Sequence, residues 1–163
     1  MSARLTNSAG LLVYRGTDRG VEVLLGHMGG PFWARKDAGA WSIPKGEYTS
    51  EEEPFQAACR EFTEELGLPA PNGTAIDLGQ VRQSGGKTVR AWAVEGQVDP
   101  AAVKPGTFSL EWPPRSGRKQ EFPEVDRVAW FAPDEARAKL VRAQTAFVDR
   151  LVAALESGAT ADG

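Results

Sequence analysis

The sequence has one cysteine, one histidine and no long uninterrupted run of apolar residues. Cys59 alone cannot form an internal disulfide or a thiolate metal site, so we expect it to pack inside the fold. No apolar run approaches the roughly 20 residues that a membrane-spanning helix needs. The first residues, MSARLTNSAGLLVYRG, lack the continuous apolar segment of an export signal. We therefore expect a cytoplasmic protein that does not enter a membrane.

The length and composition fit one globular domain. A chain of 163 residues can bury roughly two thirds of its unfolded surface, whereas two independent domains would be small. Hydrophobic residues make up 41% and charged residues 25% of the chain, which argues against intrinsic disorder. The sequence contains no internal repeat, low-complexity tract or clear linker. We expect a single domain over residues 1–163.

The apolar pattern predicts strands on both sides of one well-defined helix. The segments AGLLVYRG and VEVLLGHM are joined by TDRG, which predicts a hairpin. A second hairpin is expected where AIDLGQVRQ and KTVRAWAVEG flank SGG, and WSIP and VDRVAWF are expected to be extended. Residues 29–41 and the proline-rich stretch from Pro100 to Pro123 are expected to be irregular.

The clearest helix runs from Pro54 to Gly67. Phe55, Phe62 and Leu66 share one face at helical spacing, Pro54 suits the first turn and Gly67 suits a C-terminal cap. Two further helices are expected, at DEARAKL and at AQTAFVDRLVAALES, followed by a frayed GATADG tail. These elements predict an α/β or α+β sandwich in which helices cover both faces of a mixed sheet.

Negative charge is concentrated between Gly46 and Leu68. This stretch has seven carboxylates and one arginine, so it carries −6, while the net charge of −3 leaves +3 for the rest. Glu61, Glu64 and Glu65 lie at positions i, i+3 and i+4 of the helix, near its negative C-terminal end. A solvated helix face is one interpretation. The other is a divalent cation that relieves the repulsion, and oxygen ligands favour Mg²⁺ first and Mn²⁺ second.

The acidic stretch, GEYTSEEEPFQAACREFTEELGL, resembles the Nudix box in every defining position. The matching residues are Gly46, Glu52 and the segment REFTEELGL. The resemblance implies a Nudix α/β/α sandwich and a hydrolase of nucleoside diphosphates linked to another moiety, acting by water attack on phosphorus with Mg²⁺ or Mn²⁺. A diphosphate needs such cations, because its charge must be neutralised as the P–O bond breaks.

The same resemblance assigns roles to individual box residues. Glu61, Glu64 and Glu65 would be metal ligands and would share the catalytic site, together with the backbone carbonyl of Gly46. Arg60 would orient Glu61, and Glu52 would pair with Arg60 to tie the loop to the helix.

The resemblance also implies a water-activating base outside the box. In several Nudix hydrolases a glutamate just ahead of a strand that ends in an aromatic pair supplies it, and here that strand reads VDRVAWF. Glu124 and Glu121 both precede this strand, and we expect Glu124 to be the base because Pro123 separates Glu121 from the strand. The alternative is that both are exposed acids and that the base belongs to the box.

Several loop residues are candidates for substrate contact. Lys45 precedes the box glycine and could meet a phosphate or remain solvated. A basic cluster in the irregular stretch could clamp a polyphosphate or form ordinary surface, and it consists of Arg115, Arg118 and Lys119. Loop aromatics could stack on a base, although packing is the preferred interpretation for each; they are Phe32, Trp33, Tyr48 and Trp112.

Two other features are expected to be structural. The segment SGGKT resembles the end of a phosphate-binding P-loop, but the earlier glycine of that motif would fall at Val81, so we predict a hairpin turn. His27 could act as a base, but a single histidine near a strand end is more often structural, and we assign it no catalytic role.

The region WSIPKGEYTSEEE is similar to the corresponding part of diadenosine polyphosphate hydrolases and diphosphoinositol polyphosphate hydrolases. The resemblance implies a phosphorylated small molecule, with a dinucleoside polyphosphate or nucleoside triphosphate as the first choice. Diphosphoinositol polyphosphates and RNA 5′ ends are alternatives, and no other nucleic acid is expected. A non-catalytic nucleotide-sensing module is the alternative of a different class. We expect a monomer or homodimer.

Overall fold

The computed structural model describes residues 7–157, so the GATADG tail lies outside the described residues. The strands are β1 (Asn7–Thr17), β2 (Gly20–Met28), β3 (Trp41–Ser42), β4 (Lys45–Glu47), β5 (Ala75–Arg82), β6 (Thr88–Glu95), β7 (Thr107–Glu111), β8 (Lys119–Pro123) and β9 (Val125–Phe131). The helices are α1 (Pro54–Leu66), α2 (Pro133–Lys139) and α3 (Thr145–Glu156), with short 3₁₀ turns at Ser84–Gly86, Pro100–Ala102 and Arg142–Gln144. None of these helices is long and apolar enough to cross a bilayer.

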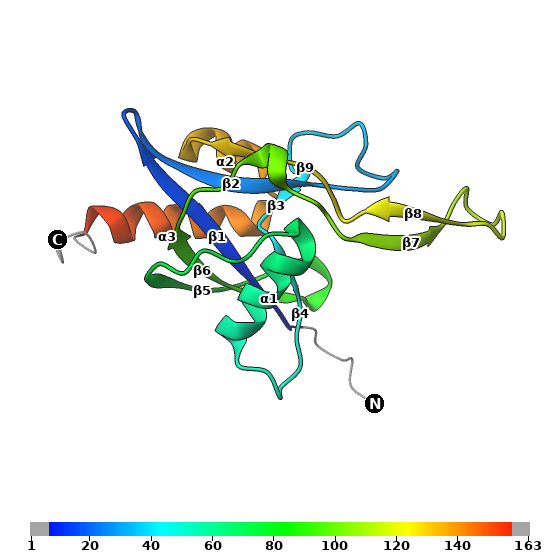
Figure 1. The fold of residues 1–163 in the computed structure, drawn as a ribbon, viewed down its shortest axis with the longest axis horizontal. Helices are drawn as coiled ribbons and strands as arrows, with labels where there is room; N and C mark the ends of the chain where they lie inside the picture. The colour runs from blue at the N-terminus through cyan, green and yellow to red at the C-terminus, as the bar shows by residue number, and fades with distance from the viewer. Residues whose placement is uncertain (1–6, 158–163) are drawn as a thin grey trace.

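A mixed sheet forms the centre of the molecule (Figure 1). Its order is β3-β2-β1-β6-β5, with β4 also paired to β1 and β9 paired to β2. Leu12 of β1 packs in a core with α2 and α3, whereas Leu11 and Val13 point to a second core with α1. Because alternate residues of one strand serve two cores, helices cover both faces, and the predicted α/β/α sandwich with a mixed sheet is confirmed.

Local sequence signals define both ends of α1. The carboxylate of Glu53 accepts hydrogen bonds from the backbone N–H groups of Phe55 and Gln56, at 3.2 and 3.0 Å. At the other end, Gly67 has φ 71° and donates its N–H to the Thr63 carbonyl. Phe62 is fully buried on the face that packs against the sheet. The carboxylate face of α1 is therefore held at a fixed position beside β4.

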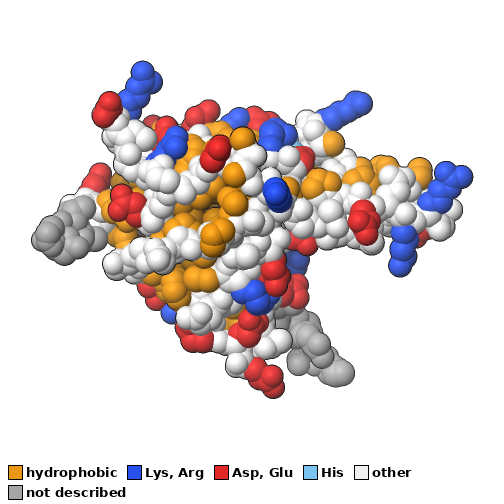
Figure 2. All heavy atoms as spheres, in the orientation of Figure 1, with side chains coloured by type: hydrophobic (Ala, Val, Ile, Leu, Met, Phe, Trp, Pro, Cys, Tyr) orange, Lys and Arg blue, Asp and Glu red, His pale blue; other side chains and the backbone are white. Residues whose placement is uncertain are grey.

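The prediction that residues 100–123 are irregular is wrong. Strands β7 and β8 form an antiparallel hairpin with Phe108 opposite Phe122, and this hairpin projects from the body of the molecule (Figure 1). Apolar side chains lie along it and basic ones near its tip (Figure 2). Each strand has only five residues; apolar and polar residues alternate in β7, whereas β8 has three polar residues before Phe122 and Pro123. Strands this short show too few residues for a periodic pattern in the sequence. Their stability comes from side-chain pairs across the hairpin, which the local sequence does not display.

His27 is fully buried, in agreement with its predicted structural role. Its Nδ1 lies 2.9 and 3.0 Å from the two carboxylate oxygens of Asp126, and its Nε2 lies 2.6 Å from the Lys36 carbonyl oxygen. Both neighbours are acceptors, so a ring that carries both protons satisfies both contacts. The histidine thereby ties the loop between β2 and β3 to β9.

We expect His27→Leu to lower the free energy of unfolding by about 1–3 kcal/mol, because it removes two hydrogen bonds and leaves the Lys36 carbonyl without this donor. Urea unfolding measures the effect. Gln56→Leu, a substitution at an exposed helix position, is the control and should change stability much less. Equal effects of the two substitutions would contradict the structural role of His27.

Candidate active site

The box carboxylates line a cavity of about 490 Å³ between α1 and the end of the sheet. Glu61, Glu64 and Glu65 come from α1, Gly46 comes from β4, and Glu124 precedes β9. The remaining lining residues are Ser8, Lys45, Glu47 and Lys87. The fold thus brings the four predicted metal-binding residues together with the preferred base candidate.

Gly46 allows α1 to approach β4 closely. Gly46 pairs with Ala9 of β1, which fixes its backbone in the sheet. A Cβ atom added at Gly46 would overlap the carboxylate of Glu61. The glycine of the box is therefore required here by contact with a box glutamate rather than by its own backbone conformation.

We expect Gly46→Ala to displace the Glu61 carboxylate while the fold persists, because a side-chain end can move more easily than the backbone. The affinity for Mn²⁺, measured by calorimetry, should fall by about tenfold or more. Gly16→Ala in β1 is a matched control, since a Cβ there meets no atom within 4 Å. A normal Mn²⁺ affinity in Gly46→Ala would show that Glu61 does not need this position.

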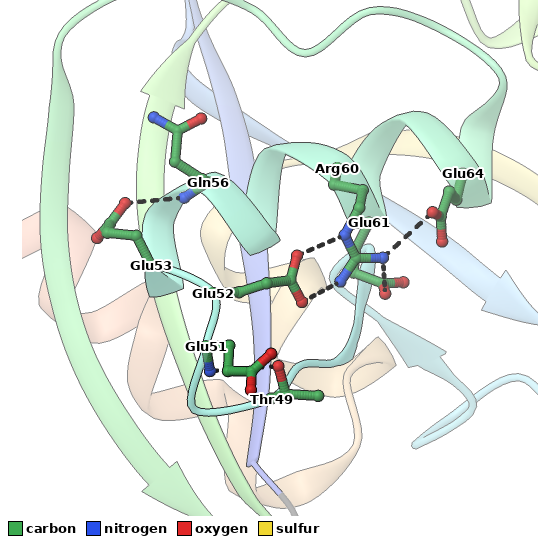
Figure 3. Close-up of polar contacts among 8 residues, drawn as sticks. All are labelled: Thr49, Glu51, Glu52, Glu53, Gln56, Arg60, Glu61 and Glu64. Carbon is green, nitrogen blue, oxygen red and sulfur yellow. Dashed lines mark hydrogen bonds and ion pairs between the residues drawn. The ribbon is translucent and has the colours of Figure 1, made fainter.

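Arg60 connects three glutamates of the box (Figure 3). Its Nε and Nη2 donate to the two carboxylate oxygens of Glu52, each at 2.8 Å, in a bidentate pair. Its Nη1 donates to Glu61 at 2.8 Å and to Glu64 at 3.1 Å. These bonds lower the pKa of Glu52 and raise that of Arg60. The geometry agrees with the expected connection of the loop to the helix through Glu52.

The pKa values of Glu61, Glu65 and Glu124, which line the cavity, are shifted toward the neutral form. Burial, followed by the charge of Glu124, raises the pKa of Glu65 to about 8. Burial, followed by the charge of Glu64, raises the pKa of Glu124. Burial also raises the pKa of Glu61 and lowers that of Lys45. The cavity therefore disfavours its own charges, as is typical of functional sites.

The donor set fits a hard divalent cation. As the side chains lie, no three histidines, cysteines, aspartates or glutamates among residues 7–157 form a ready metal cage. Instead, Arg60 donates hydrogen bonds to one carboxylate oxygen of Glu61 and one of Glu64. The cavity nevertheless offers only oxygen ligands from crowded carboxylates, and a cation of the Mg²⁺ type would relieve that crowding.

A second cavity of about 650 Å³ adjoins the first. The two cavities share five lining residues: Lys45, Glu47, Glu65, Lys87 and Glu124. Beyond them, the larger cavity is bordered by Met28, Trp33 and Phe108, together with Gly26, Gly29, Ser42, Ile43 and Val125. The combined site therefore has a carboxylate end, a shared zone in which two lysines lie among three glutamates, and a partly apolar end.

The other predicted site residues lie elsewhere. Arg115, Arg118 and Lys119 are exposed on the projecting hairpin, and none of them lines either cavity. Glu121 is exposed on β8 and accepts a hydrogen bond from the Thr107 hydroxyl at 3.4 Å.

Of the loop aromatics, only Trp33 borders the larger cavity. Phe32 and Trp112 pack edge to face at 5.4 Å, and Tyr48 packs against the core below α1.

Sequence reasoning missed Ser8, Glu47 and Lys87 as parts of the site. Ser8 pairs with Glu47 on β4 and with Val89 on β6, so three strands bring these segments together. The predicted hairpin turn at SGGKT is present, since β5 and β6 are antiparallel on either side of it. Its lysine, however, faces both cavities. A basic residue directly after a glycine-rich turn was the available signal.

Solved structures with the same fold include several hydrolases. An Ap4A hydrolase from C. elegans, in a binary complex, has a TM-score of 0.66 at 21% identity, covering 93% of this chain and 98% of that chain. The Nudix hydrolase RenU from M. smegmatis has a TM-score of 0.61 at 26% identity, covering 93% and 86%. The NUDIX domain of NrtR from Shewanella oneidensis, solved with ADP ribose, has a TM-score of 0.63 at 15% identity, covering 95% and 90%. A search of curated proteins found no match.

The family comparison covers most of the chain. The NUDIX domain model matches residues 4–151, a range that contains every residue of both cavities. This match and the hydrolase neighbours support the prediction of a pyrophosphohydrolase. The protein belongs to the Nudix family.

Proposed function

We propose that the protein is a Mg²⁺- or Mn²⁺-dependent hydrolase that cleaves a phosphoanhydride bond in a nucleoside diphosphate-linked substrate. The observation that carries the proposal is the carboxylate cavity, where Glu61, Glu65 and Glu124 meet beside Lys45. Within this class, a dinucleoside polyphosphate or a nucleoside triphosphate fits best. A substrate of this kind combines a charged phosphate chain with an apolar ring, and the joined cavities offer zones for both.

In the proposed reaction, water attacks phosphorus and the bridging P–O bond on the leaving side breaks. Glu124 accepts the proton of the attacking water, and the leaving phosphate retains the electron pair of the broken bond. Bound Mg²⁺ or Mn²⁺ would be held by Glu61, Glu64, Glu65 and the Gly46 carbonyl, and would neutralise phosphate charge. Arg60 keeps the glutamates oriented, and Lys45 binds a phosphate oxygen.

A substrate panel tests the proposal. It should contain dinucleoside polyphosphates, nucleoside triphosphates, ADP-ribose, a diphosphoinositol polyphosphate and RNA with a 5′-triphosphate. Mass spectrometry identifies the products, and the same reactions in ¹⁸O-labelled water identify the phosphorus that is attacked. We expect turnover that depends on Mg²⁺ or Mn²⁺ and stops in excess chelator. If no phosphoanhydride in the panel is cleaved, the proposed activity is wrong.

A nucleotide-sensing module is the second candidate. It is favoured by the structural likeness to the NUDIX domain of NrtR, which was solved with ADP ribose. Such a module would bind nucleotides without turnover. Measuring ADP-ribose binding by calorimetry beside phosphate release in the same sample separates the two candidates.

A further inference from the structure

Lys87 stands at the junction of the two cavities. It follows a tight turn in which Gln83 donates its backbone N–H to the Lys87 carbonyl at 2.7 Å. Gly85 and Gly86 have φ values of 81° and 84°, which few other residues adopt. The turn therefore fixes where the backbone of Lys87 enters β6.

The sheet carries this backbone to the site. Next to Lys87, Thr88 pairs with Asn7 of β1, while the neighbouring Ser8 pairs with Glu47 of β4. Three strand ends therefore lie side by side at the cavities. The result is that Lys87 lines both cavities, as Lys45 does.

The two lysines are the cations of the site that have no carboxylate partner. Arg60 is occupied by Glu52, Glu61 and Glu64. Among residues 7–157, by contrast, no ion pair within 4.0 Å involves Lys45 or Lys87. Two ammonium groups that line the same two cavities repel one another, and Glu47 and Glu65 line these cavities with them. An anionic group bound between them would offset this repulsion.

We propose that Lys87 and Lys45 form a phosphate subsite where the two cavities join, and that Lys87 selects for a longer phosphate chain. Lys45 is half-buried and Lys87 is exposed. Lys45 therefore meets the phosphate next to the one attacked, and Lys87 meets a phosphate farther along the chain. This inference rests on the proposed function, because it takes the carboxylate cavity as the site of attack.

The test measures binding rather than turnover. The probes are analogues of ADP and ATP in which methylene groups replace all bridging oxygens between phosphates, titrated calorimetrically in the presence of Mg²⁺. We expect Lys87→Ala to weaken binding of the ATP analogue by about tenfold and of the ADP analogue by less than about twofold. Lys87→Arg should retain most of the affinity, because it keeps the charge.

Two control variants locate the effect. Lys104→Ala removes an exposed lysine that lines neither cavity, and Lys119→Ala removes one from the hairpin. Both should bind the two analogues like the unmodified protein. The subsite is overturned if Lys87→Ala weakens both analogues equally, if either control weakens the ATP analogue as much, or if the unmodified protein binds neither analogue. Selective binding without turnover in the substrate panel would retain the subsite and refute the hydrolase.

Discussion

Replacing Glu65 by glutamine is expected to reduce turnover by more than about a hundredfold while leaving the fold intact. Glu65 is a proposed metal ligand, and losing even an outer-shell partner of a metal site typically costs about 10- to 100-fold. Its side chain is surrounded by other acids, and burial with the charge of Glu124 raises its pKa to about 8. The folded protein thus disfavours the ionised form, so the neutral amide should not lower the melting temperature in chelator.

Three measurements check this expectation. Turnover is measured at several Mg²⁺ concentrations, Mn²⁺ binding by calorimetry, and thermal unfolding by circular dichroism. Mn²⁺ affinity should fall together with turnover, and Glu64→Gln should behave in the same direction. Glu51→Gln is the matched control, because Glu51 belongs to the same acidic stretch but is exposed and lines neither cavity. Near-normal turnover and Mn²⁺ affinity in Glu65→Gln would refute the metal assignment.

The second large effect is expected at Glu124. We expect Glu124→Gln to lower kcat at least about tenfold with little change in KM, as the loss of a general base should. Glu124 lines both cavities beside Glu65, whereas Glu121 lines neither and contacts Thr107 on the hairpin. Glu124 is therefore our candidate for the base, because Glu121 lies outside both cavities.

Glu121→Gln supplies the matched comparison, since Glu121 and Glu124 lie close together in the sequence, on either side of Phe122 and Pro123, and both substitutions remove one charge. The kcat values of the two variants should be compared at saturating Mg²⁺ and over the pH range of activity. A larger loss in Glu121→Gln would move the base to that residue and would require the hairpin to fold toward the cavity. If neither substitution lowers kcat, the base belongs to the box itself.

The charge arrangement of the site favours the binding of a cation and an anion, as proposed above. Arg60 compensates Glu52, Glu61 and Glu64, but Glu65 and Glu124 have no ion-pair partner within 4.0 Å among residues 7–157. Glu65 is half-buried and Glu124 is exposed, and an unpaired carboxylate that is partly removed from water, as Glu65 is, costs stability in a fold without ligands. A cation at the carboxylates and a phosphate at the lysines would each remove part of that cost. Ligand binding is therefore expected to stabilise the protein, in line with mass-action linkage.

The box and its helix could be predicted from the sequence because their signals are local. The apolar spacing of Phe62 and Leu66, the cap at Gly67 and the carboxylates one turn apart all lie within one segment. Such features depend on helical periodicity and on neighbouring residues, which the sequence displays directly. The same holds for the strands whose apolar residues alternate between two cores, as in β1.

The hairpin of β7 and β8 and the position of Lys87 were decided by pairing over long distances. The hairpin strands have only five residues each, and the pairing of Phe108 with Phe122 stabilises them. Lys87 joins the site because Ser8 pairs with both Glu47 and Val89, which are 42 residues apart in the sequence. No local pattern contains such pairings.

The sequence by itself therefore determined the family, the helix that carries the acids and the carboxylates that we propose as metal ligands. Only the tertiary structure decided which outlying charges join them: it brought Glu124 and Lys87 to the cavity and left Glu121, Arg118 and Lys119 on the hairpin. The physical reason is that a site built on one helix follows from its own periodicity, whereas a site completed by strand ends depends on the register and order of the sheet.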